Sequence, residues 1–278
     1  MLNAVIFDLD GVVVDSHPLH RRAWRRFLDS VGVTVTDDEL EFVTHGGKRD
    51  DILQHFLGRL TKSEIAEYGH RKELLFREEA LDVAPLPGLP QFLNELESAR
   101  LLLAVASSAS RGRVIYMLER LQWLARFQAI ITGDDVSRGK PDPSVFLRAL
   151  AELRTDPAYT VVMEDSVAGV EAAVRAGMRC IGLANRSSSA MALREAGASL
   201  VVPDFTHLSL SRLRDLMSNP GRNPGTKTKI ADPSKQRFVP FSSAMPALTK
   251  SRGSKARSFP NRVEKSRGAS AEKNGQSF

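Results

Sequence analysis

The apolar positions of this chain form short, fully hydrophobic runs that alternate with amphipathic stretches. Residues 4–7, Ala-Val-Ile-Phe, have no polar face and therefore predict a strand that is buried on both sides in a parallel sheet. Later runs that predict strands lie at 101–106, 129–132, 160–163, 180–183 and 200–202. Amphipathic stretches that predict helices lie at 90–99, 113–121, 143–153, 168–176 and 190–196. Strand and helix units of this length predict an α/β fold with a Rossmann-like parallel-sheet core.

Residues 16–84 interrupt this alternation. The stretch begins with an amphipathic helix pattern, in which Ser16 is a candidate N-cap and Pro18 lies in the first turn. Further helical patterns follow at 37–44, 50–59 and 63–81, and no run here has the pattern of a strand. We therefore expect an inserted all-helical cap over the strand ends, while residues 1–15 and 85–217 form the core.

The positive charge of the chain is confined to its C-terminal part. The formal net charge is +6, but residues 1–217 carry 26 Lys and Arg against 30 Asp and Glu, whereas residues 218–278 carry 13 against 3. This basic tail is rich in Ser, Pro and Gly without periodicity, so we expect it to be disordered. It is either an inert extension, which we favour, or a segment that binds nucleic acid or an anionic surface.

Composition favours a cytoplasmic monomer without a membrane span. The longest apolar run, 101–106, is far shorter than the roughly 20 residues that cross a bilayer. The N-terminus lacks the basic start of a signal peptide. Cys180 is the one cysteine, which excludes an internal disulfide, and its apolar neighbours favour a buried, unreactive thiol. The arginines of the first helical pattern are interpreted as a solvated face, and they are Arg21, Arg22, Arg25 and Arg26.

Two carboxylates follow the first predicted strand. Asp8 and Asp10 point the same way in an extended chain, at the edge where open α/β sheets bind ligands. Two close carboxylates repel unless one is protonated or a cation lies between them, which indicates a metal ion, acid/base chemistry or both. A solvated acidic turn is the alternative. An EF-hand loop is excluded, because that loop needs a third oxygen ligand at the position of Val12.

Polar residues at the ends of other predicted strands should gather above the same edge of the sheet. Each set has a structural explanation of its own, as a helix cap, a solvated turn or a helix N-terminus. Together, however, two carboxylates, hard oxygens for a divalent cation, hydroxyls and an ammonium suit phosphoryl transfer. The sets are Ser107 with Ser108, then Lys140, then Glu164 with Asp165.

In their order and spacing these residues resemble the haloacid dehalogenase superfamily of phosphotransferases. The resemblance is to the branch with a small helical cap that contains β-phosphoglucomutase and related sugar-phosphate phosphatases, and it covers about Met1 to Met217. The segments that carry it are Phe7-Asp8-Leu9-Asp10-Gly11-Val12, Ala106-Ser107-Ser108, Gly139-Lys140-Pro141 and Glu164-Asp165-Ser166.

The resemblance implies a division of labour between the carboxylates. Asp8 would be the nucleophile that forms an aspartyl-phosphate, and Asp10 would be the general acid/base, kept protonated by the charge of Asp8. A Mg²⁺ ion would be held by Asp8, the backbone carbonyl of Asp10 and Asp165, with Glu164 assisting.

The resemblance also implies how the phosphoryl group is held. Ser107 and Lys140 would bind its oxygens, with Ser108 in the same substrate-binding set. Lys140 would also neutralise Asp8.

The predicted cap supplies further candidates for binding a small phosphorylated metabolite. His20, Trp24, Arg49 and Lys72 fall where this branch has residues that face a sugar phosphate. Arg49 suits a second anion because its guanidinium forms a fork, and the alternative is a salt bridge to a neighbouring Asp50 or Asp51.

The cap also departs from the mutase pattern. Mutases of this branch carry Lys at the position of His45, Asn at that of Glu73, and Ser-Lys-Asn at Ala109-Ser110-Arg111. These changes remove contacts to a bisphosphate intermediate, so we expect hydrolysis of a small phosphate monoester rather than β-phosphoglucomutase-type isomerisation of a hexose phosphate.

Overall fold

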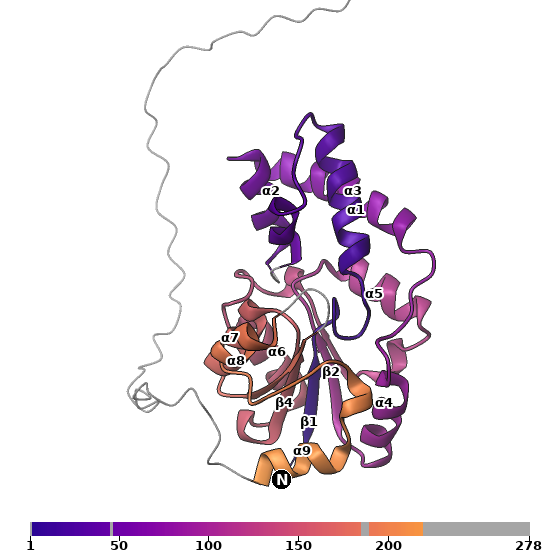
Figure 1. The fold of residues 1–278 in the computed structure, drawn as a ribbon, viewed down its shortest axis with the longest axis vertical. Coiled ribbons are helices and arrows are strands. Elements are labelled where there is room, and N and C mark those ends of the chain that lie inside the picture. Colours follow the sequence, from indigo (N-terminus) through magenta and orange to yellow (C-terminus); the bar gives the residue numbers. More distant parts are fainter. Residues whose placement is uncertain (1, 45–46, 185–188, 219–278) are drawn as a thin grey trace, which may run out of the picture. The chain divides into compact units, whose positions relative to one another are not determined.

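The computed structural model describes residues 2–44, 47–184 and 189–218, and its centre is a six-stranded sheet (Figure 1). The strand order is β3-β2-β1-β4-β5-β6, and each neighbouring pair is parallel, which confirms the predicted α/β fold. The strands are β1 (Ala4–Phe7), β2 (Leu102–Ala106), β3 (Ala129–Ile131), β4 (Thr160–Glu164), β5 (Arg179–Leu183) and β6 (Leu200–Val202).

Helices connect the later strands, at bounds close to the predicted ones. They are α4 (Leu89–Ser98), α5 (Arg111–Arg120), α6 (Ser144–Leu153), α7 (Val167–Arg175), α8 (Ala190–Glu195) and α9 (Leu210–Ser218). Short 3-10 turns are η2 (Leu124–Arg126), η3 (Gly133–Asp135), η4 (Pro157–Tyr159) and η5 (Phe205–His207). Sequence analysis did not predict α9, because its short stretch borders the patternless tail. The tail itself, apart from Ser218 at the end of α9, lies outside the described residues.

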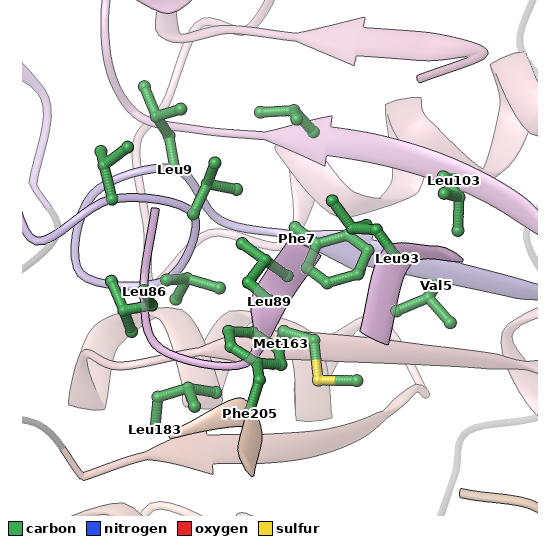
Figure 2. Close-up of a cluster of buried hydrophobic side chains, with 14 of the residues drawn as sticks. Val5, Phe7, Leu9, Leu86, Leu89, Leu93, Leu103, Met163, Leu183 and Phe205 are labelled. Atoms are coloured by element: carbon green, nitrogen blue, oxygen red, sulfur yellow. The ribbon is translucent and has the colours of Figure 1, made fainter. Parts of the chain in front are cut away.

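Alternate side chains of β1 enter two separate cores. Val5 and Phe7 join a cluster on one face of the sheet, together with apolar residues of α4 and with Phe205 (Figure 2). Apolar residues of α5 belong to the same cluster. Ala4 and Ile6 join a second cluster on the other face, against α6 and α7. All four residues of β1 are buried, as expected for a central strand of a parallel sheet with helices on both faces.

The stretch between β1 and α4 is helical, and we call residues 17–79 the helical segment. It contains α1 (His17–Ser30), η1 (Glu39–Thr44), α2 (Arg49–Leu57) and α3 (Lys62–Glu79). It has an apolar cluster of its own, which includes Trp24, Phe27, Leu40 and Leu53. The predicted helix at 37–44 is instead the 3-10 turn η1, which begins where Thr36 donates to the carboxylate of Glu39.

The chain enters and leaves this segment at one place. Val14 forms an isolated antiparallel bridge with Pro85, and the amide of Leu86 donates to the carbonyl of Val13 at 3.1 Å. The two connections therefore run side by side between the sheet and the helical segment.

The arginine face of α1 is paired with acids, as is common for a solvated charged helix face. The pairs are Arg21 with Asp37 and Glu41, Arg22 with Glu79, Arg25 with Asp37, and Arg26 with Glu78 and Glu79. Cys180 is fully buried in β5, and burial raises the pKa of its thiol well above the usual value, as expected for an unreactive thiol. Among the described residues, no helix combines the length and the apolar character that crossing a membrane requires.

Candidate active site

The register of the sheet brings the predicted site residues to one edge. Phe7 lies opposite Val105 of β2 and Met163 of β4, so Asp8 follows β1 at the level where β2 and β4 also end. The amide of Asp8 donates to the carbonyl of Met163 at 3.0 Å, which fixes the backbone at this point.

Lys140 joins two of the predicted carboxylates. Its Nζ donates to Oδ1 of Asp8 at 2.6 Å and also to Oε1 of Glu164, and all three side chains are buried. The ammonium also lies 5.0 Å from the centre of the Phe146 ring. Burial acts to lower the pKa of Lys140, but the two carboxylates outweigh it and raise this pKa above the usual value.

Asp8 is held in an environment that disfavours its charge. Burial raises the pKa of Asp8 to about 8, and the carboxylate of Glu164 adds to the rise, although Lys140 acts in the opposite direction. One ammonium cannot neutralise two buried carboxylates, so the cluster retains a proton more readily than isolated carboxylates would. An added cation would favour the ionised form of Asp8.

Both carboxylate oxygens of Glu164 accept hydrogen bonds from neighbouring residues of the site. Its Oε1 accepts from Lys140, and its Oε2 accepts from the amides of Asp165 and Ser166 at 2.8 and 2.9 Å and from the Ser166 hydroxyl at 3.0 Å. A methyl group at Gly169 would overlap this carboxylate, so α7 approaches it closely. Both oxygens are therefore engaged by donors of the protein, and the role of Glu164 as an assisting metal ligand stays a prediction.

Asp10 is surrounded by hydrogen-bond donors. Its Oδ1 accepts from the Ser16 hydroxyl at 2.5 Å and lies 3.1 Å from Nε2 of His20, and its Oδ2 accepts from Nη2 of Arg113 at 2.8 Å. Burial acts to raise the pKa of Asp10, but Arg113 and His20 outweigh it and hold this pKa well below the usual range. This arrangement favours the ionised form of Asp10, whereas the resemblance implies a proton on it, and Arg113 of α5 was not among the residues predicted from the sequence.

Ser16 also differs from its expected role. It occupies the N-cap position of α1, but its side chain makes no capping hydrogen bond to the helix, because its hydroxyl donates to Asp10. It therefore links the start of the helical segment to the candidate site.

Asp165 faces a histidine that sequence analysis did not single out. Oδ2 of Asp165 lies 2.5 Å from Nε2 of His17, and both side chains are nearly buried. Burial acts to lower the pKa of His17, but the hydrogen bond and charge of Asp165 raise it to about 9. A Cβ on Gly11, whose φ is +75°, would overlap both side chains, so only glycine allows the backbone to pass here.

A pocket lies above these residues and is lined by both the strand ends and the helical segment. Its lining includes every predicted substrate-binding residue except Lys140, together with two of the predicted carboxylates. From the strand ends come Asp10, Ser107, Ser108 and Asp165, and from the helical segment come His20, Trp24, Arg49 and Lys72. Asp8, Lys140 and Glu164 are buried and do not belong to this lining.

The serines of the β2 end are placed by the turn that follows it. Oγ of Ser107 accepts from the amide of Ala109 at 3.1 Å, and the amide of Ser107 donates to the carbonyl of Ile131 at 3.0 Å. Ser107 is buried, and both Ser107 and Ser108 line the pocket.

Lys72 and His20 form one network with Asp10. Nζ of Lys72 lies 3.0 Å from Nδ1 of His20, whose ring stacks on Phe76 at a centroid distance of 4.3 Å. Lys72 is almost fully buried, and burial, assisted by the charge of Arg113, holds its pKa well below the usual value. Burial and Lys72 likewise keep the pKa of His20 well below its usual range.

Arg49 has the partner that the alternative interpretation named, and it also lines the pocket. Its Nε and Nη2 donate to Oδ1 of Asp50 at 3.1 and 3.0 Å. A Cβ at Gly69 would lie 2.6 Å from Nε of Arg49, so the missing side chain on α3 makes room for the guanidinium. His45, whose identity departs from the mutase pattern, lies outside the described residues.

Arg113 and His17 are site residues that were not predicted from the sequence. Arg113 lies in the first turn of α5, the helix that follows Ser107 and Ser108, and His17 is the first residue of α1. A search of the helix starts that follow the predicted strand ends could have found both, because first-turn side chains lie near the ligand-binding edge.

Fold and site together define an α/β enzyme whose strand ends carry a buried carboxylate and lysine pair beneath a pocket. The model of the family described as haloacid dehalogenase-like hydrolase matches residues 5–183, and the chain belongs to this family. The chain is 34% identical over 209 residues to "Phosphorylated carbohydrates phosphatase" of Thermotoga maritima. The aligned region covers 73% of this chain and 95% of that protein.

Two further relatives bear the name of a mutase. "Beta-phosphoglucomutase" of Bacillus subtilis is 31% identical over 223 residues, which covers 77% of this chain and 95% of that protein. The crystal structure of β-phosphoglucomutase from Clostridium difficile matches with a TM-score of 0.71 and 25% identity over 78% of this chain and 98% of that one. The chain is thus an enzyme of the haloacid dehalogenase type, related to both phosphatases and a phosphomutase.

Proposed function

We propose that this enzyme hydrolyses a small phosphate monoester, such as a sugar phosphate, through an aspartyl-phosphate on Asp8. The observation that carries the proposal is the contact between Lys140 and Asp8 at 2.6 Å, at the strand ends below a pocket lined by Ser107, Asp10 and Asp165. A relative that acts on phosphorylated carbohydrates, by its name, supports this class of substrate.

In the first step, a carboxylate oxygen of Asp8 attacks phosphorus and the bond to the leaving oxygen breaks. Lys140 and Ser107 bind oxygens of the transferring group and stabilise its charge. The leaving oxygen takes a proton from Asp10. Because the groups around Asp10 hold its pKa low, this step needs Asp10 to bind a proton first, and the charge of Arg113 opposes that.

In the second step, water attacks phosphorus and the bond to the Asp8 oxygen breaks. Asp10, now a carboxylate again, accepts the proton of the water. The donors around Asp10 favour this basic form, since they lower its pKa.

The donor set at the strand ends fits Mg²⁺. Mg²⁺ binds through one or two carboxylates plus phosphate oxygens and water, and Asp8 and Asp165 offer two nearby buried carboxylates. The described residues contain no group of three or more His, Cys, Asp and Glu side chains arranged for a metal ion, so substrate and water would complete the shell. We propose that Asp8, Asp165 and the Asp10 carbonyl hold the ion and that Glu164 positions Lys140. The ion would neutralise the repulsion between Asp8 and the incoming dianion.

We further propose that residues 16–84 act as a cap that selects the substrate, over a core of residues 1–15 and 85–217. The pocket lining supports this, because His20, Trp24 and Lys72 contribute to it from the helical segment. The basic tail from residue 218 has no part in the proposed chemistry.

Substitution of Asp8 by Asn tests the proposal. With Mg²⁺ and glucose 6-phosphate, we expect phosphate release from the wild type and none from Asp8→Asn, while Asp15→Asn, an exposed acid in the same stretch, should keep its rate. A phosphorylated chain, trapped by acid quench and detected by mass, should appear in the wild type alone. Phosphate release by Asp8→Asn at the wild-type rate would contradict the mechanism.

The mutase remains the second candidate, because a relative named β-phosphoglucomutase covers most of this chain. The two activities differ in whether water or a sugar hydroxyl accepts the phosphoryl group. Formation of glucose 6-phosphate from β-glucose 1-phosphate without net phosphate release would select the mutase.

A further inference from the structure

Glu73 places a carboxylate in the pocket that the proposed chemistry does not use. It lies on α3 next to Lys72, lines the pocket, and its side chain is 14% exposed. Its Oε1 is buried and has no hydrogen-bond partner among the described residues. A buried carboxylate oxygen without a donor is unfavourable, so a rotation of the Glu73 side chain that brought this oxygen to a donor on a ligand in the pocket would be stabilising.

The nearest cation leaves this oxygen without a hydrogen bond. Nε of Arg77 lies 3.5 Å from Oε1 of Glu73, and it too is buried without a hydrogen-bond partner within the described ranges. The rest of the Arg77 guanidinium is directed elsewhere, since Nη2 lies 3.5 Å from the carbonyl of Gly112 and Cζ lies 5.0 Å from the ring centre of Tyr116.

The other basic groups of the pocket have acceptors of their own. Arg113 donates to Asp10, Arg49 donates to Asp50, and Nζ of Lys72 contacts a ring nitrogen of His20. None of these contacts involves Glu73. The Glu73 carboxylate therefore contributes a negative charge to the pocket lining from the helical segment, with Arg77 as its one ion-pair partner among the described residues.

We propose that Glu73 is a specificity-determining residue, which accepts a hydrogen bond from a hydroxyl of the leaving group and repels a second phosphate. This inference rests on the proposed function and names its substrate class, a polyhydroxylated monophosphate. A carboxylate beside a phosphate costs binding energy because both are anions, whereas a hydroxyl is a neutral donor. The same repulsion disfavours the bisphosphate through which a phosphomutase works, so Glu73 favours release of the phosphoryl group to water.

Binding to a variant that cannot turn over tests Glu73 separately from catalysis. In the Asp8→Asn background with Mg²⁺, calorimetry would measure the Kd of glucose 6-phosphate and of glucose 1,6-bisphosphate. Adding Glu73→Gln keeps the acceptor oxygen and removes the charge, so we expect the bisphosphate to bind about tenfold more tightly and the monophosphate to change by less than about threefold. Adding Glu73→Leu also removes the acceptor, and the monophosphate should then bind about tenfold more weakly.

Glu78→Gln is the matched control, since Glu78 is an exposed glutamate of the same helix that pairs with Arg26. Glu78→Gln should leave the Kd of glucose 6-phosphate and the Kd of glucose 1,6-bisphosphate unchanged. If Glu73 served only as a structural partner of Arg77, Glu73→Gln would lower the midpoint of thermal unfolding and leave the ratio of the two constants as it was. An unchanged ratio, or a monophosphate that does not bind to the Asp8→Asn protein at all, overturns the inference.

The proposed function can fail independently. If wild-type enzyme releases no phosphate from glucose 6-phosphate, or if Asp8→Asn releases it as fast, the mechanism is wrong whatever the ratio of constants. If the wild type releases phosphate and Asp8→Asn does not, but Glu73→Gln leaves the ratio unchanged, the mechanism stands and the role of Glu73 is wrong.

Discussion

Gly139 and Lys48 form a contact between the helical segment and the loop that carries Lys140. Nζ of Lys48 donates to the carbonyl of Val136 at 2.8 Å, and the aliphatic part of Lys48 passes over Gly139. A Cβ at Gly139 would lie 2.5 Å from Cγ, 3.2 Å from Cδ and 3.3 Å from the backbone nitrogen of Lys48. Substitution of Gly139 by Ala therefore forces the Lys48 side chain to move.

The cost follows from what that movement breaks. Loss of the hydrogen bond from Lys48 to Val136 costs about 0.5–1.5 kcal/mol. Crowding against the remaining atoms adds to this, so we expect Gly139→Ala to lower the free energy of unfolding by about 1–2 kcal/mol. In a Lys48→Ala background the side-chain clash and the hydrogen bond are both absent. There, Gly139→Ala should cost less than about 0.5 kcal/mol.

Urea unfolding of the four proteins, followed by far-ultraviolet circular dichroism, completes this double-mutant cycle. Gly112→Ala is the control, and it should raise the free energy of unfolding instead of lowering it. It lies in α5, where an added Cβ meets only Nη2 of Arg77 at 3.6 Å, so it should stabilise by roughly 0.5–1 kcal/mol. Equal effects of Gly139→Ala in both backgrounds would show that its cost does not arise from Lys48, and the reasoning would be refuted.

Three further predictions concern the charges around the pocket. Lys140→Met leaves the carboxylates of Asp8 and Glu164 buried without a cation, so it should abolish turnover and lower the unfolding free energy by about 3–5 kcal/mol in urea. Arg113→Met removes a group that holds the pKa of Asp10 low, so the alkaline limb of the pH profile of kcat/KM should move to higher pH, because protonated Asp10 then persists further. Asp135→Asn should lower the unfolding free energy at pH 7 by about 1 kcal/mol, since Asp135 accepts from the amide and hydroxyl of Thr132.

The loss of unfolding free energy in Asp135→Asn should become smaller as the pH falls. Burial acts to raise the pKa of Asp135, but Thr132 and Arg111 outweigh it and lower this pKa in the folded state. The stabilisation is therefore fully present above the unfolded pKa of about 3.9 and is lost as pH falls through the folded value. The two proteins should thus converge in stability once the pH lies below the folded-state pKa of Asp135. A difference in unfolding free energy between the wild type and Asp135→Asn that persists at such a pH would contradict the stabilising role given to the Asp135 carboxylate.

The other two predictions have outcomes that would contradict them as well. A Lys140→Met protein with wild-type turnover would exclude Lys140 from the reaction. An unshifted pH profile in Arg113→Met, with thermal stability retained, would mean that Arg113 does not control the proton on Asp10. Arg111→Met, which alters an exposed arginine of the same helix, is the control for Arg113.

The fold was predictable because its strands are fully apolar and end abruptly in polar residues. Val5 and Phe7 lie on one face and Ala4 and Ile6 on the other, so the absence of any polar face in β1 directly reflects burial from both sides. Helix bounds followed from the same pattern. The stretch at η1 did not, since a six-residue run cannot distinguish a 3-10 turn from an α-helix.

The convergence of the strand ends was predictable, but the partners of each carboxylate were not. Parallel register alone places Asp8 beside the ends of β2 and β4. By contrast, the contacts of Asp10 with Arg113 and of Asp165 with His17 depend on the angle at which helices leave the strand ends. Sequence periodicity gives the buried face of a helix and says nothing about that angle. The contact of Asp10 with Arg113, which opposes the proton expected on Asp10, was missed for this reason.

The bridge between Val14 and Pro85 has a consequence for how such an enzyme can diverge. A segment whose two ends are neighbours can be replaced by another of different length or shape without stretching the sheet that hosts it. The residues that we propose to select the substrate, Glu73 among them, lie in this exchangeable segment, whereas Asp8 and Lys140 belong to the sheet that hosts it. New preferences can therefore evolve by changes on one side of the bridge while the reactive groups on the other side stay in place.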